Sequence, residues 1–244
     1  MFAPPAGGWA EAELEPRNAN DVDVIIDGAN YFPRLVEALR SARSHVYIAS
    51  WYLTPDFELI RKPGERLTVA DLLAEVGRRA EVKVLVWAGA PIPPNLRTSR
   101  SDVKRIGREL RAGGNVEFAA DNKEHMLHCH HEKLVVIDDR LAFVGGIDMT
   151  DLAGDRYDSS EHPERSSQGW HDVTTRLTGP IVADVSGHFR LRWRDVTGED
   201  LGPAKTPEAA GSVRVQLVRS VPERIYDSLP NGDFSIMESY MRAL

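Results

Sequence analysis

The sequence predicts an α/β fold in which a mixed β-sheet is flanked by helices. Three observations support this class. Apolar segments of strand length recur along the chain, amphipathic segments of helix length separate most of them, and one short polar turn joins two apolar segments directly. Strands that alternate with helices are typical of an α/β sheet, and the short turn is typical of a hairpin.

The first half of the chain supplies the alternating elements. A strand at Val22–Ile26 precedes a helix with apolar residues at helical spacing, namely Phe32, Leu35, Val36, Leu39 and Ala42. Further strands are expected at Val46–Leu53, Val82–Trp87 and Val116–Ala119. The helices between them carry Leu72, Leu73 and Val76, then Val103, Ile106 and Leu110.

In the second half, strands and helices do not alternate in the same way. Strands at His128–Ile137 and Leu141–Ile147 are separated only by Asp138-Asp139-Arg140, which predicts a hairpin. The polar stretch Asp151–Gly169 has no periodicity and predicts a long surface loop. A strand at His171–Leu177 and a helix carrying Val182, Val185, Phe189 and Trp193 follow it.

We expect four parts along the chain: a flexible N-terminal segment at residues 1–20, a half-domain at 21–195, a linker at 196–212 and a final part at 213–244. The final part repeats the order of the opening strand and helix, with Val213–Val218 followed by Phe234–Leu244. This repetition predicts that a second copy of the fold begins there and is truncated. The alternative is a closing strand and helix that resemble the opening pair only by chance.

Composition limits the classes of function. The 244 residues include 30 Lys and Arg against 37 Asp and Glu, so the net charge is −7. This balance disfavours a dedicated nucleic-acid binder, because such proteins attract phosphate at long range. The lone Cys129 excludes an intrachain disulfide, and Met1–Pro16 lacks the pattern of a signal peptide. No apolar run has the length of a membrane span, so we expect a cytoplasmic protein.

The chemistry is concentrated around residues 125–138, where half of the eight histidines lie: His125, His128, His130 and His131. On a strand, His131 and Lys133 would share one face. A lysine beside a metal ligand would repel the cation, and the spacing matches no standard zinc pattern. We therefore expect no metal and no cofactor. An edge strand with solvated histidines remains possible, but a buried His and Lys pair suits a phosphate better.

These residues resemble the H-x-K-x4-D signature of the phospholipase D superfamily. His131, Lys133 and Asp138 match the signature, and Gly145-Gly146-Ile147-Asp148 follows it. Other segments resemble the N-terminal half of eukaryotic-like phospholipases D, including Ile26-Asp27-Gly28, Ser50-Trp51-Tyr52-Leu53, Trp170-His171-Asp172-Val173 and Arg192-Trp193. The resemblance implies a phospholipase D-like half-domain with the start of a second copy.

The resemblance also implies a phosphodiesterase that hydrolyses or exchanges the headgroup of glycerophospholipids at a membrane surface, without a metal. His131 would attack the phosphorus and form a phosphohistidine. Lys133 would hold a phosphoryl oxygen, and Asp172 would fix the tautomer of His131. These three residues are the candidate catalytic set.

Further residues near the signature receive lesser roles. Asp138 lies at the predicted hairpin turn, where capping of the turn is a better expectation than contact with substrate. Gly145 and Gly146 are expected beside the phosphate, where the backbone can approach closely, although a tight turn explains them equally well. Asp148 is a further candidate beside the phosphate.

The chain carries one signature, whereas relatives with two signatures build one site between two halves. A second half-domain or a homodimer partner is therefore expected to complete the site, and the chain alone is expected to have little activity. Two alternatives stay open. One is a single-motif homodimeric endonuclease, against which the net charge counts. The other is an inactive remnant that binds phospholipid or phosphate.

Overall fold

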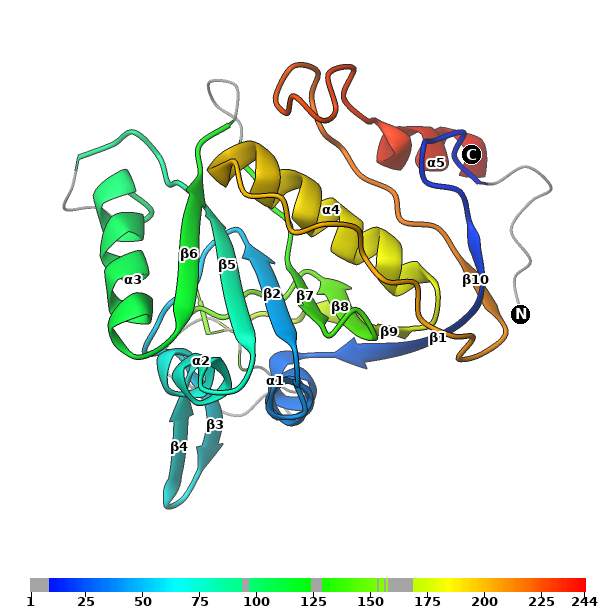
Figure 1. The fold of residues 1–244 in the computed structure, drawn as a ribbon. Helices are drawn as coiled ribbons and strands as arrows, with labels where there is room; N and C mark the ends of the chain where they lie inside the picture. The colour runs from blue at the N-terminus through cyan, green and yellow to red at the C-terminus, as the bar shows by residue number, and fades with distance from the viewer. Residues whose placement is uncertain (1–8, 94–96, 124–128, 153, 156, 158–168) are drawn as a thin grey trace.

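A computed structural model describes residues 9–93, 97–123, 129–152, 154–155, 157 and 169–244 (Figure 1). Its elements are β1 (Arg17–Ile26), α1 (Gly28–Arg40), β2 (His45–Ser50), β3 (Glu58–Lys62), β4 (Glu65–Thr68), α2 (Val69–Gly77), β5 (Glu81–Trp87), α3 (Arg100–Ala112), β6 (Val116–Asp121), β7 (Leu134–Ile137), β8 (Leu141–Gly145), β9 (Val173–Thr178), α4 (Ile181–Thr197), β10 (Val213–Val215) and α5 (Ser235–Ala243). The predicted α/β class with a mixed sheet is confirmed.

The large sheet has the strand order β10-β1-β9-β8-β7-β2-β5-β6. Strands β2, β5 and β6 are parallel, and each later member of this trio is reached through a helix. The other neighbours in the sheet are antiparallel, including the predicted hairpin of β7 and β8. β3 and β4 form a separate hairpin, which the sequence pattern did not predict.

Helices cover both faces of the sheet. Val46 and Ile48 of β2 point to the core that contains α1, α2 and α3. Tyr47 and Ala49 point to the opposite core, where α4 packs across the sheet (Figure 1). Because successive side chains of β2 face opposite cores, apolar residues fill the strand without alternation.

The catalytic segment differs from the prediction. β7 begins at Leu134, so residues 129–133 precede the strand rather than belonging to it. The reason is that its neighbour β2 ends at Ser50, and the last pair between these two strands is Ala49 with Leu134. β8 likewise ends at Gly145, two residues before the predicted end. The expectation that His131 and Lys133 belong to a strand is therefore wrong, but the two side chains do lie together, as expected.

Two element boundaries cross the predicted division of the chain. β1 starts at Arg17, inside the predicted N-terminal segment, and pairs with β10. α4 continues to Thr197, past the predicted start of the linker. The division into four parts, with a second copy beginning at residue 213, remains a prediction. The predicted loop at residues 151–169 lies mostly outside the described residues.

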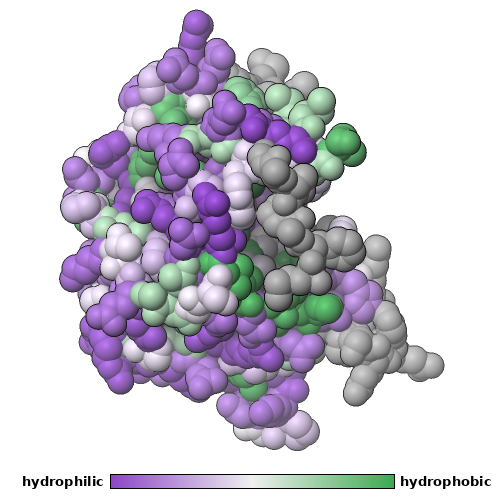
Figure 2. All heavy atoms as spheres, turned by 90° about the vertical axis from the view of Figure 1, so that its right-hand side faces the viewer, coloured by the Kyte–Doolittle hydropathy of each residue, from purple (hydrophilic) through white to green (hydrophobic). Residues whose placement is uncertain are grey.

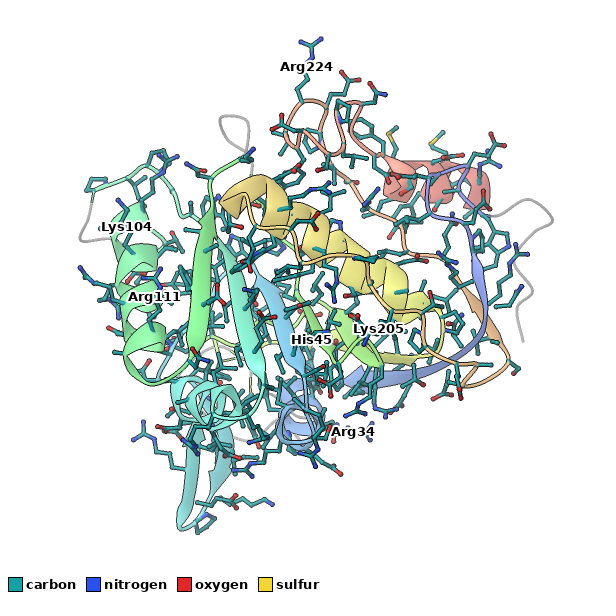
Figure 3. The ribbon with its side chains drawn as sticks, in the orientation of Figure 1. Arg34, His45, Lys104, Arg111, Lys205 and Arg224 are labelled. Carbon is teal, nitrogen blue, oxygen red and sulfur yellow. The ribbon has the colours of Figure 1, made fainter. Side chains whose placement is uncertain are left out.

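The segment after α4 runs back along the sheet and is held there by polar contacts. Glu199 forms an ion pair of 3.0 Å with the buried Lys83. The amide of Lys205 donates to Asp139 at 2.9 Å, and that of Ala210 donates to the carbonyl of Ala19 at 2.9 Å. Figure 3 places Lys205 and His45 close to the sheet, whereas Arg224 projects outward from a loop.

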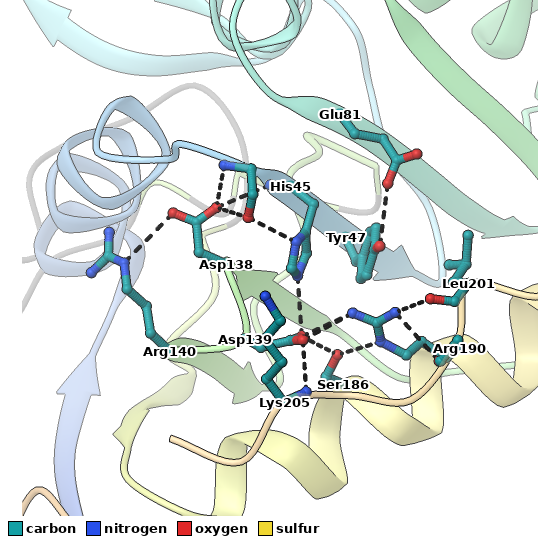
Figure 4. A network of polar contacts seen from close by, with 12 residues as sticks. His45, Tyr47, Glu81, Asp138, Asp139, Arg140, Ser186, Arg190, Leu201 and Lys205 are labelled. Atoms are coloured by element: carbon teal, nitrogen blue, oxygen red, sulfur yellow. Dashed lines mark hydrogen bonds and ion pairs between the residues drawn. The ribbon is translucent and has the colours of Figure 1, made fainter. Parts of the chain in front are cut away.

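Asp139 is the centre of this network (Figure 4). Its carboxylate lies 3.1 Å from His45 Nε2 and accepts hydrogen bonds from Ser186 Oγ at 2.6 Å and from Arg190 at 3.0 Å. Burial alone would raise the pKa of Asp139, but these partners hold it well below its usual value. The turn between β7 and β8 is thereby fixed to α4.

The face of the molecule drawn in Figure 2 is mostly hydrophilic. Figure 2 views the side that bears β1, β10 and α5, and shows hydrophobic residues in separate patches. Exposed apolar side chains occur on β1 and on α5, including Ile26, Met237 and Tyr240. Within the described ranges, no helix has the length and apolar character needed to cross a bilayer.

Candidate active site

His131 and Lys133 lie in direct contact. The Lys133 ammonium is 3.0 Å from His131 Nδ1 and 3.2 Å from the His131 carbonyl oxygen. An ammonium group has only donors, so the imidazole nitrogen that faces it accepts, which requires a neutral ring. The neutral ring is the nucleophilic form of histidine. The His131 ring also packs on Trp51, with 5.1 Å between the ring centroids.

Asp148 explains how Lys133 is buried. Lys133 is 8% exposed and Asp148 is 1% exposed, and their charged groups are 3.1 Å apart. A buried ammonium requires a partner of opposite charge, and Asp148 supplies it without any ligand. Asp148 was predicted to lie beside a phosphate. Its position on Lys133 means that an incoming phosphoryl group must share this lysine with a carboxylate.

Asp172 lies at the start of β9, next to the predicted glycine turn. A Cβ atom added to Gly146 would lie 2.1 Å from Asp172 Oδ1. A Cβ atom added to Gly145 would lie 2.3 Å from the Cα atom of Thr174. The space at both glycines is therefore occupied by β9 and by the Asp172 carboxylate. The proposed contact of Asp172 with His131 stays a prediction.

Two segments that carry the family resemblance meet beside Asp172. His171 Nδ1 is 2.9 Å from Asp27 Oδ1, although the two residues are separated by 144 positions in the sequence. The amide of Asp27 also donates to the carbonyl of Asp172 at 2.9 Å. These contacts fix the end of β1 to the beginning of β9, and therefore fix the backbone of Asp172.

Asp138 lies at the turn after β7 and has structural contacts. Its carboxylate accepts hydrogen bonds from three consecutive amides, those of Arg43, Ser44 and His45, at 2.9, 2.8 and 3.0 Å. Burial would raise the pKa of Asp138, but the hydrogen bonds from His45 and Ser44 lower it overall. The carboxylate thus joins the β7–β8 turn to the start of β2.

A cavity of about 690 Å³ opens beside His131 and Lys133. His131, Lys133 and Cys129 line one side of it. The segment after β10 and the start of α5 provide an apolar wall, which consists of Leu217, Val218, Val221, Pro222, Ile225 and Ile236. A cavity with a cationic and an apolar side suits an amphiphilic ligand with a phosphate group.

The lining of this cavity also contains a buried ionic network, with Glu132 and Arg192, that the sequence pattern did not predict. Arg192 of α4 is 2% exposed, and its guanidinium contacts the carboxylates of Asp121 and Glu132. Burial would raise the pKa of Glu132, but Arg192 and His188 hold it far below its usual value. Asp121, Glu132 and Arg192 lie far apart in the sequence and therefore form no recognisable spacing pattern. Arg192 does belong to Arg192-Trp193, one of the segments that resemble the phospholipases D.

Among the residues that the structure describes, no group of three or more His, Cys, Asp or Glu side chains is arranged to hold a metal ion. His125 and His128 lie outside the described residues.

Comparison with known proteins identifies the family. The sequence profile of the family described as phospholipase D matches residues 38–167, which is more than half of the chain. Phospholipase D alpha 1 of Zea mays is 26% identical over an alignment of 273 positions, gaps included. The alignment covers 81% of this chain and 33% of the maize protein. The major cardiolipin synthase ClsA of Bacillus subtilis is 28% identical over 242 residues, covering 92% of this chain and 45% of that protein.

A solved structure is similar as well. The phosphatidylserine synthase of Haemophilus influenzae aligns with a TM-score of 0.48 and 19% identity, over 74% of this chain and 39% of the other. The chain thus spans about a third to under a half of the length of these relatives. The profile match over more than half of the sequence shows that the chain belongs to the phospholipase D family.

Proposed function

We propose that this chain contributes half of the active site of a phosphodiesterase that cleaves or exchanges the headgroup of glycerophospholipids at a membrane surface. The observation that carries the proposal is the His131 imidazole, whose Nδ1 lies 3.0 Å from the Lys133 ammonium, beside a cavity with an apolar wall. The polar side fits the phosphodiester, and the apolar wall fits the hydrocarbon part of a lipid.

The reaction proceeds by two displacements. A nitrogen of His131 forms a bond to phosphorus, and the bond from phosphorus to the headgroup oxygen breaks. The departing alcohol takes a proton from a general acid, which we assign to a second half-domain or to a homodimer partner. Water or a second alcohol then attacks the phosphohistidine, so hydrolysis or exchange restores the free imidazole.

The other candidates support this chemistry. Lys133 stabilises the negative charge that develops on the phosphoryl oxygens. Asp148 keeps Lys133 charged and in place before the substrate arrives. The Asp172 carboxylate accepts a hydrogen bond from the N–H group of the His131 ring and thereby fixes the tautomer, as a carboxylate does in other triads.

Trapping of the covalent intermediate tests the proposal. The protein is mixed with vesicles of phosphatidylcholine labelled at phosphorus, quenched in alkali and digested, and the labelled peptide is located by mass spectrometry. We expect label on His131, no label in His131→Asn, and normal labelling in the control His45→Asn, whose histidine lies outside the cavity. Label on another residue would contradict the assignment.

The same experiment separates the alternatives. An endonuclease would leave the vesicles intact and nick DNA without added metal. An inactive remnant would bind vesicles without turnover, and Lys133→Ala would abolish that binding. Release of choline that depends on His131 excludes both.

A further inference from the structure

Side chains next to His131 and Lys133 hold the catalytic segment, residues 129–133, to the rest of the protein. These residues precede β7, which begins at Leu134, and the sheet contacts them through the Lys133 carbonyl, which accepts a hydrogen bond from the Gly145 amide at 3.2 Å. Their side chains nevertheless alternate in contact. His131 and Lys133 contact each other and Trp51, whereas His130 and Glu132 contact groups from α4, β6 and the segment after β10.

Glu132, between the two catalytic candidates, contacts two side chains of α4. Its Oε2 is 2.7 Å from His188 Nε2, and its Oε1 accepts a hydrogen bond from Arg192 Nη1. The Glu132 side chain is 31% exposed, while that of Arg192 is 2% exposed. The guanidinium therefore lies beneath the segment and fixes it from inside the protein.

Arg192 is itself fixed by a rigid acceptor. Its Nη2 is 2.7 Å from Asp121 Oδ2, at the end of β6, and its Nε donates to the Tyr226 hydroxyl at 2.9 Å. Tyr226 in turn donates to Asp121 Oδ2 at 2.6 Å. The planar guanidinium thus joins two carboxylates, one in the sheet and one in the catalytic segment.

The other neighbour of His131 connects to the same groups. His130 Nε2 donates to the carbonyl of Lys123 at 2.9 Å and is 3.5 Å from Asp121 Oδ1. The His130 ring stacks on Tyr226, with 5.6 Å between the centroids. Both residues that flank His131 are therefore attached to the Asp121, Arg192 and Tyr226 cluster.

We propose that Arg192 is a positioning residue, which acts through Glu132 to hold His131 and Lys133 in the geometry that the phosphoryl group requires. The proposal rests on the proposed function for its catalytic consequence. Arg192→Lys keeps the positive charge. An ammonium group lacks the planar set of N–H donors with which the guanidinium joins Asp121 and Glu132. A displacement of about 1 Å at reacting atoms can cost about 100-fold in rate.

The test compares two identical substitutions on one helix. Arg192→Lys disturbs the proposed anchor. Arg190→Lys is the matched control, because Arg190 also donates two hydrogen bonds to a buried carboxylate, at 3.1 and 3.0 Å from the two oxygens of Asp139, outside the cavity. We expect Arg192→Lys to lower kcat for phosphatidylcholine vesicles by about 100-fold, with KM within about threefold, and Arg190→Lys to leave both unchanged.

A second readout does not depend on turnover. Nitrogen-15 NMR spectra of the histidine side chains report the tautomer and order of the His131 ring, once His131→Asn has identified its signals. We expect shifted or broadened His131 signals in Arg192→Lys and unchanged signals in Arg190→Lys. If the wild-type chain lacks turnover with its second half-domain or homodimer partner present, the proposed function fails, while the NMR comparison still decides whether Arg192 positions His131.

Glu132→Gln covers the case in which Arg192→Lys does not fold. This variant keeps the shape of the side chain and removes its charge. We expect the same loss of kcat and the same change at His131. A folded Arg192→Lys or Glu132→Gln protein with kcat within twofold of wild type and unchanged His131 signals would overturn the proposal.

Discussion

Gly146→Ala is the substitution that most directly examines the assignment of Asp172. The added methyl carbon would lie 2.1 Å from Asp172 Oδ1 and 2.6 Å from Asp172 Cγ. Ordinary contact begins near 3.4 Å, so the carboxylate must move by about 1 Å. Overpacking of this kind costs about 1–3 kcal/mol of stability. If Asp172 fixes the His131 tautomer, the same movement lowers kcat by about 100-fold.

Gly187→Ala is the matched control for this prediction. Gly187 lies in α4, and no atom outside its local surroundings lies within 4 Å of an added Cβ. Alanine in a helix interior is more stable than glycine by about 0.5–1 kcal/mol, so we expect a higher melting temperature and unchanged activity. Thermal unfolding followed by circular dichroism gives the stabilities, and choline release gives kcat.

The outcome for Gly146→Ala separates two roles of Asp172. A destabilised variant with kcat near wild type would refute the catalytic role, because the carboxylate would have moved without consequence for His131. Asp172→Asn provides the comparison, since it removes the charge without adding bulk. We expect both variants to lose activity to a similar degree.

Three further predictions concern stability and access. Asp139→Asn removes the centre of the network in Figure 4 and should cost about 3–5 kcal/mol in urea denaturation, whereas the exposed pair of Asp23 with Arg34 should lose under about 1 kcal/mol in Asp23→Asn. The pKa values of Glu132 and Asp139 are lower in the folded protein than in the unfolded chain, so these carboxylates stabilise the fold above pH about 4 and lose this effect as the pH falls below it. A free energy of unfolding that stays constant from pH 7 to 3 would contradict this account. Alkylation of the exposed Cys129, which lines the cavity, should inhibit turnover, and Cys129→Ser should be resistant.

Most of the fold could be predicted because its strands bury apolar side chains on a regular spacing. β2 and β5 contain the apolar runs Val46–Ala49 and Val84–Trp87, and the helices between the parallel strands carry one apolar face. The hairpin of β3 and β4 was missed because it is rich in charged residues, with Arg61, Lys62, Glu65 and Arg66 near its turn.

The catalytic pair could be predicted as residues but not as geometry. The sequence placed His131 and Lys133 on a strand, whereas the structure brings them together before the strand begins. The partner of Lys133 was also misjudged. A phosphate was expected to balance its charge, and Asp148 already does so. Partners such as Arg192 and Glu132 meet only through tertiary packing, which a single sequence does not encode as a local pattern.

The placement of β1 has a consequence for how the protein folds. β1 pairs with β9 along its second half, and Asp21 of β1 lies opposite Thr178 of β9. During synthesis, the first strand must therefore wait until most of the chain has left the ribosome before it finds its neighbour. The parallel strands β2, β5 and β6 lie closer together in the sequence and can assemble earlier. Contacts between distant parts of a chain form slowly, so the pairing of β1 with β9 is expected to limit the folding rate.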